Sequence, residues 1–343
     1  MKILIVTSMY PSPEKKYSGI FVKNQYEQLQ TLMKEGEEIE LFYMKRTFTS
    51  FFGSIKKYVA AFFRFTPYFF KKFDVIHLHS FYPLIIVTWL YKIFYPKTKL
   101  VVTFHGTDVN QQVNSRNAKL MQFLSKKINF TIPVGKEVAK NVSEKLKLPI
   151  GKTLPVGVNS NIFYPEKDTD KIYDYLFVGS FIKRKGVDFL MKSIRDISPD
   201  IRFCIAGSGD DFQSSIEKLI KEGYSIELKG EQTHEELCTL YNQSKFFVLP
   251  SRSEGFATVI IESMYCGTPV ITSDIPQFIE QVNDQENGFT FPLDQPEKLT
   301  ELLSNLINIS TSEYQNMALC AQNSFKNISL NMVCDELMKI YRL

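Results

Sequence analysis

Residues 250–274 read PSRSEGFATVIIESMYCGTPVITSD, and this stretch carries the clearest structural signal in the chain. Two glutamates, Glu254 and Glu262, stand eight residues apart in it, and the sequence from 255 to 273 contains no charged residue except Glu262. An isolated carboxyl group in apolar sequence is costly to bury unless it is hydrogen-bonded. The position of each glutamate relative to secondary structure therefore decides what the stretch can do.

A short helix is predicted over residues 258–266, between two strands. Thr258 is the expected N-cap, apolar residues follow it, and Gly267 with Pro269 forms a stop signal. Glu262 then lies one turn into a helix that is apolar nearly all round. The alternative is that Glu262 is an exposed residue on a surface helix.

Glu254 falls in the loop before this helix. Backbone N–H groups and the positive end of the helix dipole gather there, which suits a phosphate or a polar ligand. Together Glu254 and Glu262 predict a ligand cup at a strand-to-helix turn. The alternative is that Glu254 is a solvated loop charge.

Short β-branched runs alternate with helical stretches along the chain, which predicts parallel sheets with crossover helices. A polar, strand-poor stretch over 159–171 is the expected linker. We therefore expect an α/β fold of two doubly wound, Rossmann-like domains that face each other across a cleft, with ligands at the carboxyl ends of the strands. The predicted strands are 3–7, 39–43, 75–79, 100–104 and 130–133 in the first half, and 175–178, 201–206, 226–229, 246–249 and 270–272 in the second.

Several strand ends carry residues capable of chemistry. Strand 100–104 runs into His105, and the loop after the first strand contains Gly19, which would let backbone approach a ligand closely. Strand 175–178 runs into a loop that holds three consecutive cations between Gly179 and Gly186. Such a loop predicts a diphosphate clamp, and a solvated basic helix start is the alternative.

Bulk properties exclude several classes of protein. The length of 343 residues predicts two domains, and a net charge of +4 gives no reason to expect nucleic acid as a partner. The five cysteines form no Cys-x-x-Cys pair and the four histidines are scattered, so neither a disulfide framework nor a metal site is expected. The Asp168-Thr169-Asp170 sequence is assigned to solvent. The apolar runs at 3–7 and 81–91 are too short for a signal peptide and a membrane span, which predicts a cytoplasmic protein.

The segment 45–73 is unusual because it contains seven Lys or Arg, eleven aromatic residues and no acidic residue. Its aromatic and apolar residues partly follow helical spacing, with lysines to one side. A basic, aromatic amphipathic helix of this kind can lie in the interface of an anionic membrane. Ordinary core packing of a crossover helix is the alternative for part of the stripe.

The order of these motifs resembles that of the retaining glycosyltransferases of family 4, the group 1 transferases with the GT-B fold. The central match is the Glu-x7-Glu signature from Glu254 to Glu262. The resemblance covers most of the chain and implies an acceptor-binding domain over 1–160, a nucleotide-sugar donor-binding domain over 161–327, and a C-terminal helix at about 328–343 that packs back on the first domain. Supporting matches are VGVN at 156–159, FYP at 163–165, VG at 178–179, KG at 185–186, AGSG at 206–209, HEEL at 234–237 and NGF at 287–289.

The resemblance also assigns the donor site. It places Glu262 on the ribose, Glu254 near the transferred ring and Lys185 on the diphosphate. The family usually has an arginine where this chain has Ser180, and Arg184 is expected to supply the missing guanidinium. The further donor-binding residues that it implies are Gly179, Ser180, Gly207, Gly255, Phe256, Ala257 and Thr258.

On the acceptor side, the resemblance implies that His105 faces the reacting sugar and that Ser18 and Gly19 match the family's glycine pair. The catalytic residues would then be Glu254, His105, Lys185 and Arg184. Without the family, a hydrogen-bonded core histidine is the alternative for His105.

The activity that follows from the resemblance is transfer, with retention, of a hexosyl or N-acetylhexosaminyl unit from a nucleotide-diphosphate sugar. Family frequency favours UDP, and no cofactor or metal is expected because Lys185, Arg184 and the amides of 254–258 would stabilise the leaving diphosphate. The expected acceptor is a lipid-linked saccharide at the inner face of the plasma membrane, in synthesis of a cell-surface polysaccharide or glycolipid. The alternatives are a small soluble acceptor such as malate, a non-catalytic nucleotide-sugar-binding protein, and an epimerase or phosphorylase-like enzyme of similar architecture.

Overall fold

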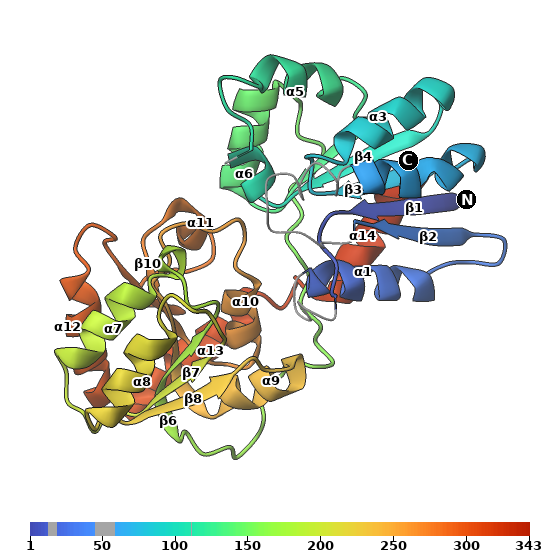
Figure 1. Ribbon diagram of the computed structural model, residues 1–343. Coiled ribbons are helices and arrows are strands. Elements are labelled where there is room, and N and C mark those ends of the chain that lie inside the picture. The colour runs from blue at the N-terminus through green and yellow to red at the C-terminus, as the bar shows by residue number, and fades with distance from the viewer. Residues whose placement is uncertain (13–18, 45–58, 111) are drawn as a thin grey trace. The chain divides into compact units, whose positions relative to one another are not determined.

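The computed structural model describes residues 1–12, 19–44, 59–110 and 112–343 (Figure 1). The chain divides into two compact units, one comprising Met1–Gly157 with Leu330–Leu343 and the other Val158–Ser329. Each unit contains one β-sheet whose named strands pair in parallel, with helices packed on it. Both units are therefore Rossmann-like α/β domains, which confirms the predicted fold class.

The first unit is built on a five-stranded sheet in the order β2-β1-β3-β4-β5. Residues 59–65 are helical and lead into the 3-10 turn η1 (Thr66–Phe70). The strands are β1 (Lys2–Thr7), β2 (Glu38–Tyr43), β3 (Val75–His79), β4 (Lys99–Phe104) and β5 (Phe130–Pro133). The further helices are α1 (Ile20–Thr31), α3 (Ile85–Phe94), α4 (Thr107–Asn110), α5 (Ala118–Ser125), α6 (Lys136–Asn141), the π-helical turn η2 (Val142–Leu146) and α14 (Leu330–Arg342).

The C-terminal helix α14 belongs to this first unit. Alternate strand residues such as Ile3 and Ile5 lie in one buried cluster with Val22 of α1 and Leu337 of α14. Helices α1 and α14 contact each other, and Figure 1 shows them on the same side of the sheet. Because successive strand residues point to opposite faces, these two helices cover one face of the sheet.

The second unit has a six-stranded sheet in the order β11-β10-β9-β6-β7-β8. Its strands are β6 (Tyr173–Val178), β7 (Phe203–Ala206), β8 (Ile226–Gly230), β9 (Ser244–Leu249), β10 (Val270–Ser273) and β11 (Gly288–Phe291). Its helices are η3 (Lys183–Lys185), α7 (Val187–Arg195), α8 (Gln213–Lys221), α9 (His234–Asn242), α10 (Thr258–Tyr265), α11 (Pro276–Ile279), α12 (Glu297–Asn305), η4 (Leu306–Asn308) and α13 (Thr311–Ser324).

All ten predicted strands are present, with bounds within two residues of the expected ones. Strand β11 is missing from the predicted set, because a four-residue segment that starts with glycine has little strand signal of its own. The expected linker over 159–171 lies in the second unit instead. There Phe163 is buried and its ring contacts those of Tyr241 and His234.

The predicted N-cap of helix α10 is wrong. Thr258 is the first helical residue, and the N-cap is Ala257, which provides no side-chain cap. The Thr258 side chain instead hydrogen-bonds Glu262, which lies one turn further along the helix. The predicted end holds, since Cys266 is the C-cap and Gly267 has a φ of 73°.

The longest apolar run, residues 81–91, forms the loop after β3 and most of helix α3. None of the helices in the described ranges is long and apolar enough to cross a bilayer.

Candidate active site

Glu254 is buried at the carboxyl end of β9 and is surrounded by cations. Its side chain is 8% exposed, and its Oε1 atom lies 2.7 Å from Nζ of Lys185. Its Oε2 atom accepts a hydrogen bond from Nη1 of Arg184 at 3.2 Å, and Ser251 Oγ donates to Oε1 at 2.8 Å. Glu254 is therefore not a solvated loop charge.

The sheet order brings this group together. Strands β6 and β9 are neighbours and parallel, so the loops that follow them start at the same edge of the sheet. The loop after β6 carries the cations in the turn η3, and Gly186 closes it with a φ of 71°. A Cβ atom on Gly186 would lie 1.8 Å from the carbonyl oxygen of Pro250, so only glycine lets the two loops approach this closely.

Arg252 links the loop after β9 to the loop after β6, and it was not among the residues predicted from the sequence. Its backbone N–H donates to the carbonyl of Arg184 at 2.8 Å, and its guanidinium donates to both carboxylate oxygens of Asp188 at 2.6 Å. The guanidinium also lies 3.7 Å from the ring centroid of Phe189. Arg252 therefore fixes the backbone that carries Arg184 and Lys185, because a bidentate, stacked arginine has little freedom.

Glu262 is buried, 7% exposed, one turn into α10. Burial raises the pKa of its carboxyl group to about 7, and hydrogen bonds from Thr258 and Tyr241 oppose that rise. The Tyr241 hydroxyl donates to Oε2 over 3.4 Å, which is a weak bond. A buried carboxyl group with one weak partner is suited to accept hydrogen bonds from a ligand, and its low exposure excludes the surface-helix alternative.

Two of the predicted donor-site glycines pack against each other. A Cβ atom on Gly207 would lie 1.9 Å from the carbonyl oxygen of Gly179, and the backbone N–H of Gly207 donates to Gly230 at 2.6 Å. These contacts explain why position 207 requires glycine on packing grounds alone, independent of any ligand. Ser180 lies between β6 and η3 and is exposed.

The turn between β9 and α10 holds the other predicted donor residues. Gly255 and Phe256 are partly exposed, while Ala257 is 4% exposed and its carbonyl accepts a hydrogen bond from Gln281 at 3.3 Å. Phe256 packs against the core of the unit. The turn is thus anchored by the hydrogen bond from Gln281 and by the packing of Phe256, while Gly255 remains partly exposed.

In the first unit, Gly19 is the N-cap of α1 and has a φ of 73°. A Cβ atom there would lie 2.4 Å from the backbone of Met9, so the close approach that requires glycine is between the two ends of the connection from β1 to α1. Ser18 lies outside the described residues.

Three of the four histidines lie together in space, which their sequence spacing did not predict, whereas His234 lies on α9 in the second unit. His77, His79 and His105 form one cluster at neighbouring strands β3 and β4, with 3.2 Å between Nδ1 of His79 and Nε2 of His105. Tyr341 of α14 and Thr103 bond the two ring nitrogens of His77. Burial lowers the pKa of His105 to about 3, so the ring is neutral at physiological pH.

The described part of segment 45–73 divides between core and surface, and residues 45–58 lie outside the described ranges. Phe65 and Phe73 are fully buried, as the core-packing alternative requires. Phe62, Phe63 and Phe70 are exposed to 40, 68 and 85%. Among the described residues of the segment, the membrane-facing interpretation can therefore apply to this second group but not to the buried Phe65 and Phe73.

Comparisons with known proteins identify the family of this chain. The family model described as glycosyl transferases group 1 matches residues 161–323, and the model described as glycosyltransferase family 4 matches residues 26–160. An uncharacterized glycosyltransferase of Methanocaldococcus jannaschii is 33% identical over 244 residues, which are 68% of this chain and 66% of that protein. The match thus spans about two thirds of that relative's length.

Two further proteins are informative. The N,N'-diacetylbacillosaminyl-diphospho-undecaprenol alpha-1,3-N-acetylgalactosaminyltransferase of Campylobacter jejuni is 24% identical over 67% of this chain and 58% of its own length. The crystal structure of Anabaena HepE in complex with UDP and glucose superposes with a TM-score of 0.76 at 15% identity, and covers all of this chain and 99% of that one. At this identity the superposition shows the fold alone. With both family models matched along the chain and two Rossmann-like units in the structure, the chain belongs to the group 1, family 4 glycosyltransferases and is an enzyme of the GT-B fold.

Proposed function

We propose that this glycosyltransferase moves a hexosyl or N-acetylhexosaminyl unit from a UDP-sugar to a lipid-linked saccharide, with retention of configuration. The observation that carries the donor half is the buried Glu254 with Lys185 and Arg184 on it, together with the buried Glu262 eight residues further along the chain. Two relatives support the assignment by their names, since HepE was crystallised with UDP and glucose and the Campylobacter jejuni enzyme acts on a diphospho-undecaprenol substrate.

In this proposal the donor site divides its tasks among three side chains. Glu262 accepts hydrogen bonds from the ribose hydroxyls, because its buried carboxyl group gains more from strong donors than from the distant Tyr241 hydroxyl. Lys185 and Arg184 move from Glu254 toward the diphosphate, and Glu254 then holds the hydroxyls of the transferred sugar. Because two side-chain cations serve the diphosphate, we propose that no divalent metal is needed.

The chemistry requires few catalytic side chains. The glycosidic C–O bond to the diphosphate breaks, the sugar becomes oxocarbenium-like, and Lys185, Arg184 and the amides of 254–258 stabilise the negative charge on the leaving oxygens. The acceptor hydroxyl attacks on the face that the diphosphate leaves, and its proton passes to that diphosphate. His105, whose imidazole is neutral, orients the sugar by hydrogen bonding.

The acceptor half of the proposal rests on the first unit. Phe62, Phe63 and Phe70 are exposed within a segment that contains Arg64 and Lys72 and no acid. Such a surface suits the anionic, inner face of a plasma membrane, where an acceptor carried on a lipid would be found.

The test is incubation of the purified enzyme with radiolabelled UDP-glucose, UDP-galactose, UDP-GlcNAc and UDP-GalNAc in the presence of a bacterial lipid-linked saccharide extract. The proposal expects label from one donor to enter the organic phase, with an α-anomeric product by NMR from an α-linked donor. Transfer of label to a water-soluble acceptor alone, or release of a β-anomer, would contradict it.

A further inference from the structure

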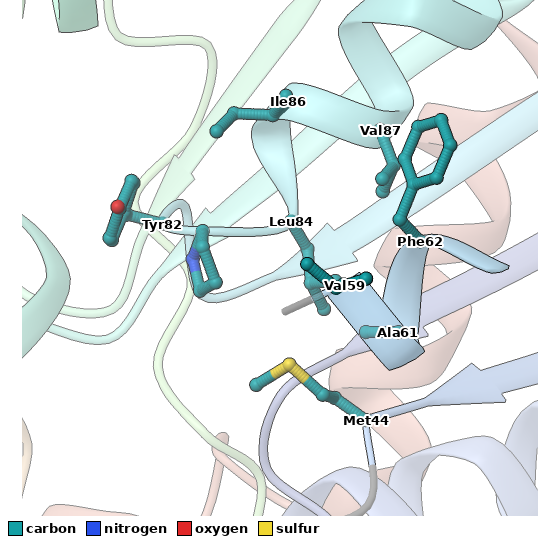
Figure 2. Close-up of a pocket in the computed structure, with 9 residues that line it drawn as sticks. Met44, Val59, Ala61, Phe62, Tyr82, Leu84, Ile86 and Val87 are labelled. Atoms are coloured by element: carbon teal, nitrogen blue, oxygen red, sulfur yellow. The ribbon is translucent and has the colours of Figure 1, made fainter. Parts of the chain in front are cut away.

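An apolar pocket of ≈ 280 Å³ lies in the first unit, where strands β2 and β3 end (Figure 2). Met44 directly follows β2, and Tyr82 to Leu84 lie in the loop after β3. The helical residues 59–65 contribute one wall and the first turn of α3 contributes another. Figure 2 shows the side chains of Met44, Val59 and Leu84 around this space.

The lining is apolar apart from the hydroxyl group of Tyr82. Its floor is buried, since Leu84 and Val87 are exposed to only 2 and 6%. Its rim is not, because Val59, Phe62 and Ile86 are exposed to 50, 40 and 41%. Large apolar side chains gain free energy when they leave water, so an apolar ligand that entered the pocket would be stabilised by both floor and rim.

The pocket lies at the functional edge of the sheet. In parallel α/β sheets, ligands bind beyond the carboxyl ends of the strands. At this edge β3 ends with His79, and β4 ends directly before His105. Tyr43, the last residue of β2, stacks on Tyr10 from the loop after β1 at 4.7 Å between ring centroids. The pocket therefore lies at the sheet edge where the loops that lead to the proposed acceptor-side residues Gly19 and His105 also begin.

Arg64 supplies a cation on the same helical segment, residues 59–65, as the pocket residues Val59, Ala61 and Phe62. Its guanidinium carbon lies 5.9 Å from the ring centroids of both Phe42 and Tyr43, and Tyr43 directly precedes the pocket residue Met44 in the chain. The side chain is exposed, and in the part of the chain that the structure describes it forms no ion pair with a carboxylate. An arginine held on aromatic rings with its donors in solvent is suited to bind a phosphate.

We propose that this pocket binds the phosphate-proximal hydrocarbon of the lipid carrier and that Arg64 pairs with the carrier's phosphate. The ligand class is a hydrocarbon chain esterified to phosphate or diphosphate. The charge of Arg64 beside a dry, apolar space selects this amphiphile over an uncharged oil or a polar saccharide. The inference rests on the proposed lipid-linked acceptor. If it holds, the first unit recognises the lipid carrier as well as the saccharide of the acceptor.

The test uses the full chain and farnesyl phosphate, kept below its critical micelle concentration, in a calorimetric titration. Inorganic phosphate is the matched ligand without a chain, and UDP is titrated in parallel as an independent measure of the second unit. We expect farnesyl phosphate to bind at least tenfold more tightly than inorganic phosphate, and Arg64→Gln to weaken it severalfold while reducing its salt dependence.

The neighbouring phenylalanines provide a matched pair of variants. Phe62 lines the pocket whereas Phe63 does not, and both are exposed, so a substitution at either position leaves the core intact. Phe62→Asp should weaken farnesyl phosphate binding at least tenfold, while Phe63→Asp should change it less than twofold. Both variants should bind UDP as the wild type does.

Each result opposite to these expectations overturns either the pocket proposal or the donor half of the proposed function. If farnesyl phosphate fails to bind a protein that binds UDP, the pocket proposal is wrong and the donor assignment stands. Equal losses in Phe62→Asp and Phe63→Asp would show a diffuse apolar surface, such as one for a bilayer or a partner helix, and would also overturn the pocket. Failure of UDP to bind while farnesyl phosphate binds would overturn the donor half of the proposed function alone.

Discussion

Lys185 and Glu254 form an ion pair, with 2.7 Å between Nζ and Oε1, although they come from loops after different strands. The cation proposed for the donor diphosphate is thus neutralised in the ligand-free protein by the glutamate proposed for the donor sugar. A donor that enters must separate the pair, since its phosphates and the carboxylate compete for one ammonium group. Binding of the nucleotide and positioning of Glu254 are therefore coupled.

This coupling predicts opposite effects at the two positions. Glu254→Gln should leave UDP affinity unchanged or raise it, because a competitor for Lys185 has lost its charge, and should lower kcat at least tenfold. Lys185→Met should lower kcat by about 10²–10³, the usual effect of removing one preorganised donor to a developing charge. Calorimetry with UDP and initial rates with the UDP-sugar measure the two effects separately. A loss of UDP affinity in Glu254→Gln as large as that in Lys185→Met would contradict the competition.

The raised pKa of Glu262, about 7, predicts a pH dependence of nucleotide binding. Ribose hydroxyls donate to the ionised carboxylate, so UDP affinity should fall about tenfold per pH unit below 7 and level off above it. Glu262→Gln should remove most of this dependence while lowering affinity at pH 8. A profile that stays flat from pH 5.5 to 8 in the wild type would rule out Glu262 as the acceptor.

The Glu262 carboxyl group should also make the stability of the folded protein depend on pH. Its pKa is raised from 4.5 in the unfolded chain to about 7 in the native state, so between these values the native state holds the extra proton. Stability must then fall as pH rises through this window, because ionisation is easier in the unfolded chain. Glu262→Gln should gain Tm relative to wild type between pH 5 and pH 8, which scanning calorimetry can measure.

Gly186 is predicted to be indispensable for the cationic loop. Gly186→Ala would place a methyl group 1.8 Å from the Pro250 carbonyl oxygen, so the two loops must separate. Gly223 also has a positive φ, 96°, but has no atom within 4 Å of an added Cβ, and Gly223→Ala is therefore the control for backbone strain alone. Gly223→Ala should cost about 1–2 kcal/mol of unfolding free energy, and Gly186→Ala should cost more and also weaken UDP binding. Similar losses of stability with unchanged UDP binding would refute the close-approach argument.

Arg252 is expected to act only by positioning the loop that carries Arg184 and Lys185. Arg252→Lys keeps the charge but loses the two-pronged contact with Asp188, so the loop that carries Arg184 and Lys185 should loosen and UDP affinity should fall severalfold. Arg202 makes a comparable contact with Asp174 next to the opposite, amino end of the sheet, and Arg202→Lys is the matched control. Its UDP affinity should equal that of the wild type. If both variants lose affinity equally, the effect is one of general stability.

The sequence was sufficient for ten of the eleven named strands and for helix α10. Buried strands of parallel sheets are continuous apolar, β-branched runs, so strands such as β3 and β5 are found with their observed bounds. The helix after Glu254 was predicted because local signals, apolar spacing and the Gly267 stop, determine it. The burial of Glu262 followed from the absence of other charges around it.

What the sequence could not predict depends on long-range contacts. Arg252 contacts Asp188 only because β6 and β9 are adjacent in the sheet, and local sequence does not determine strand order. The histidine cluster arises in the same way, since β3 and β4 pair in register and bring His79 toward His105. Thr258 was assigned to a cap because its hydroxyl fits that role equally well, and the competing carboxyl group of Glu262 determined the outcome.

The most direct test of the central claim is a calorimetric titration of the wild-type chain and of Glu262→Ala with UDP, and then with GDP, in buffer that contains EDTA. The account predicts that the wild type binds UDP without metal, that it binds GDP more weakly, and that Glu262→Ala loses at least tenfold in UDP affinity. Equal UDP affinity in the two proteins would contradict the ribose assignment, and no binding of either nucleotide to the wild type would contradict a metal-independent donor site.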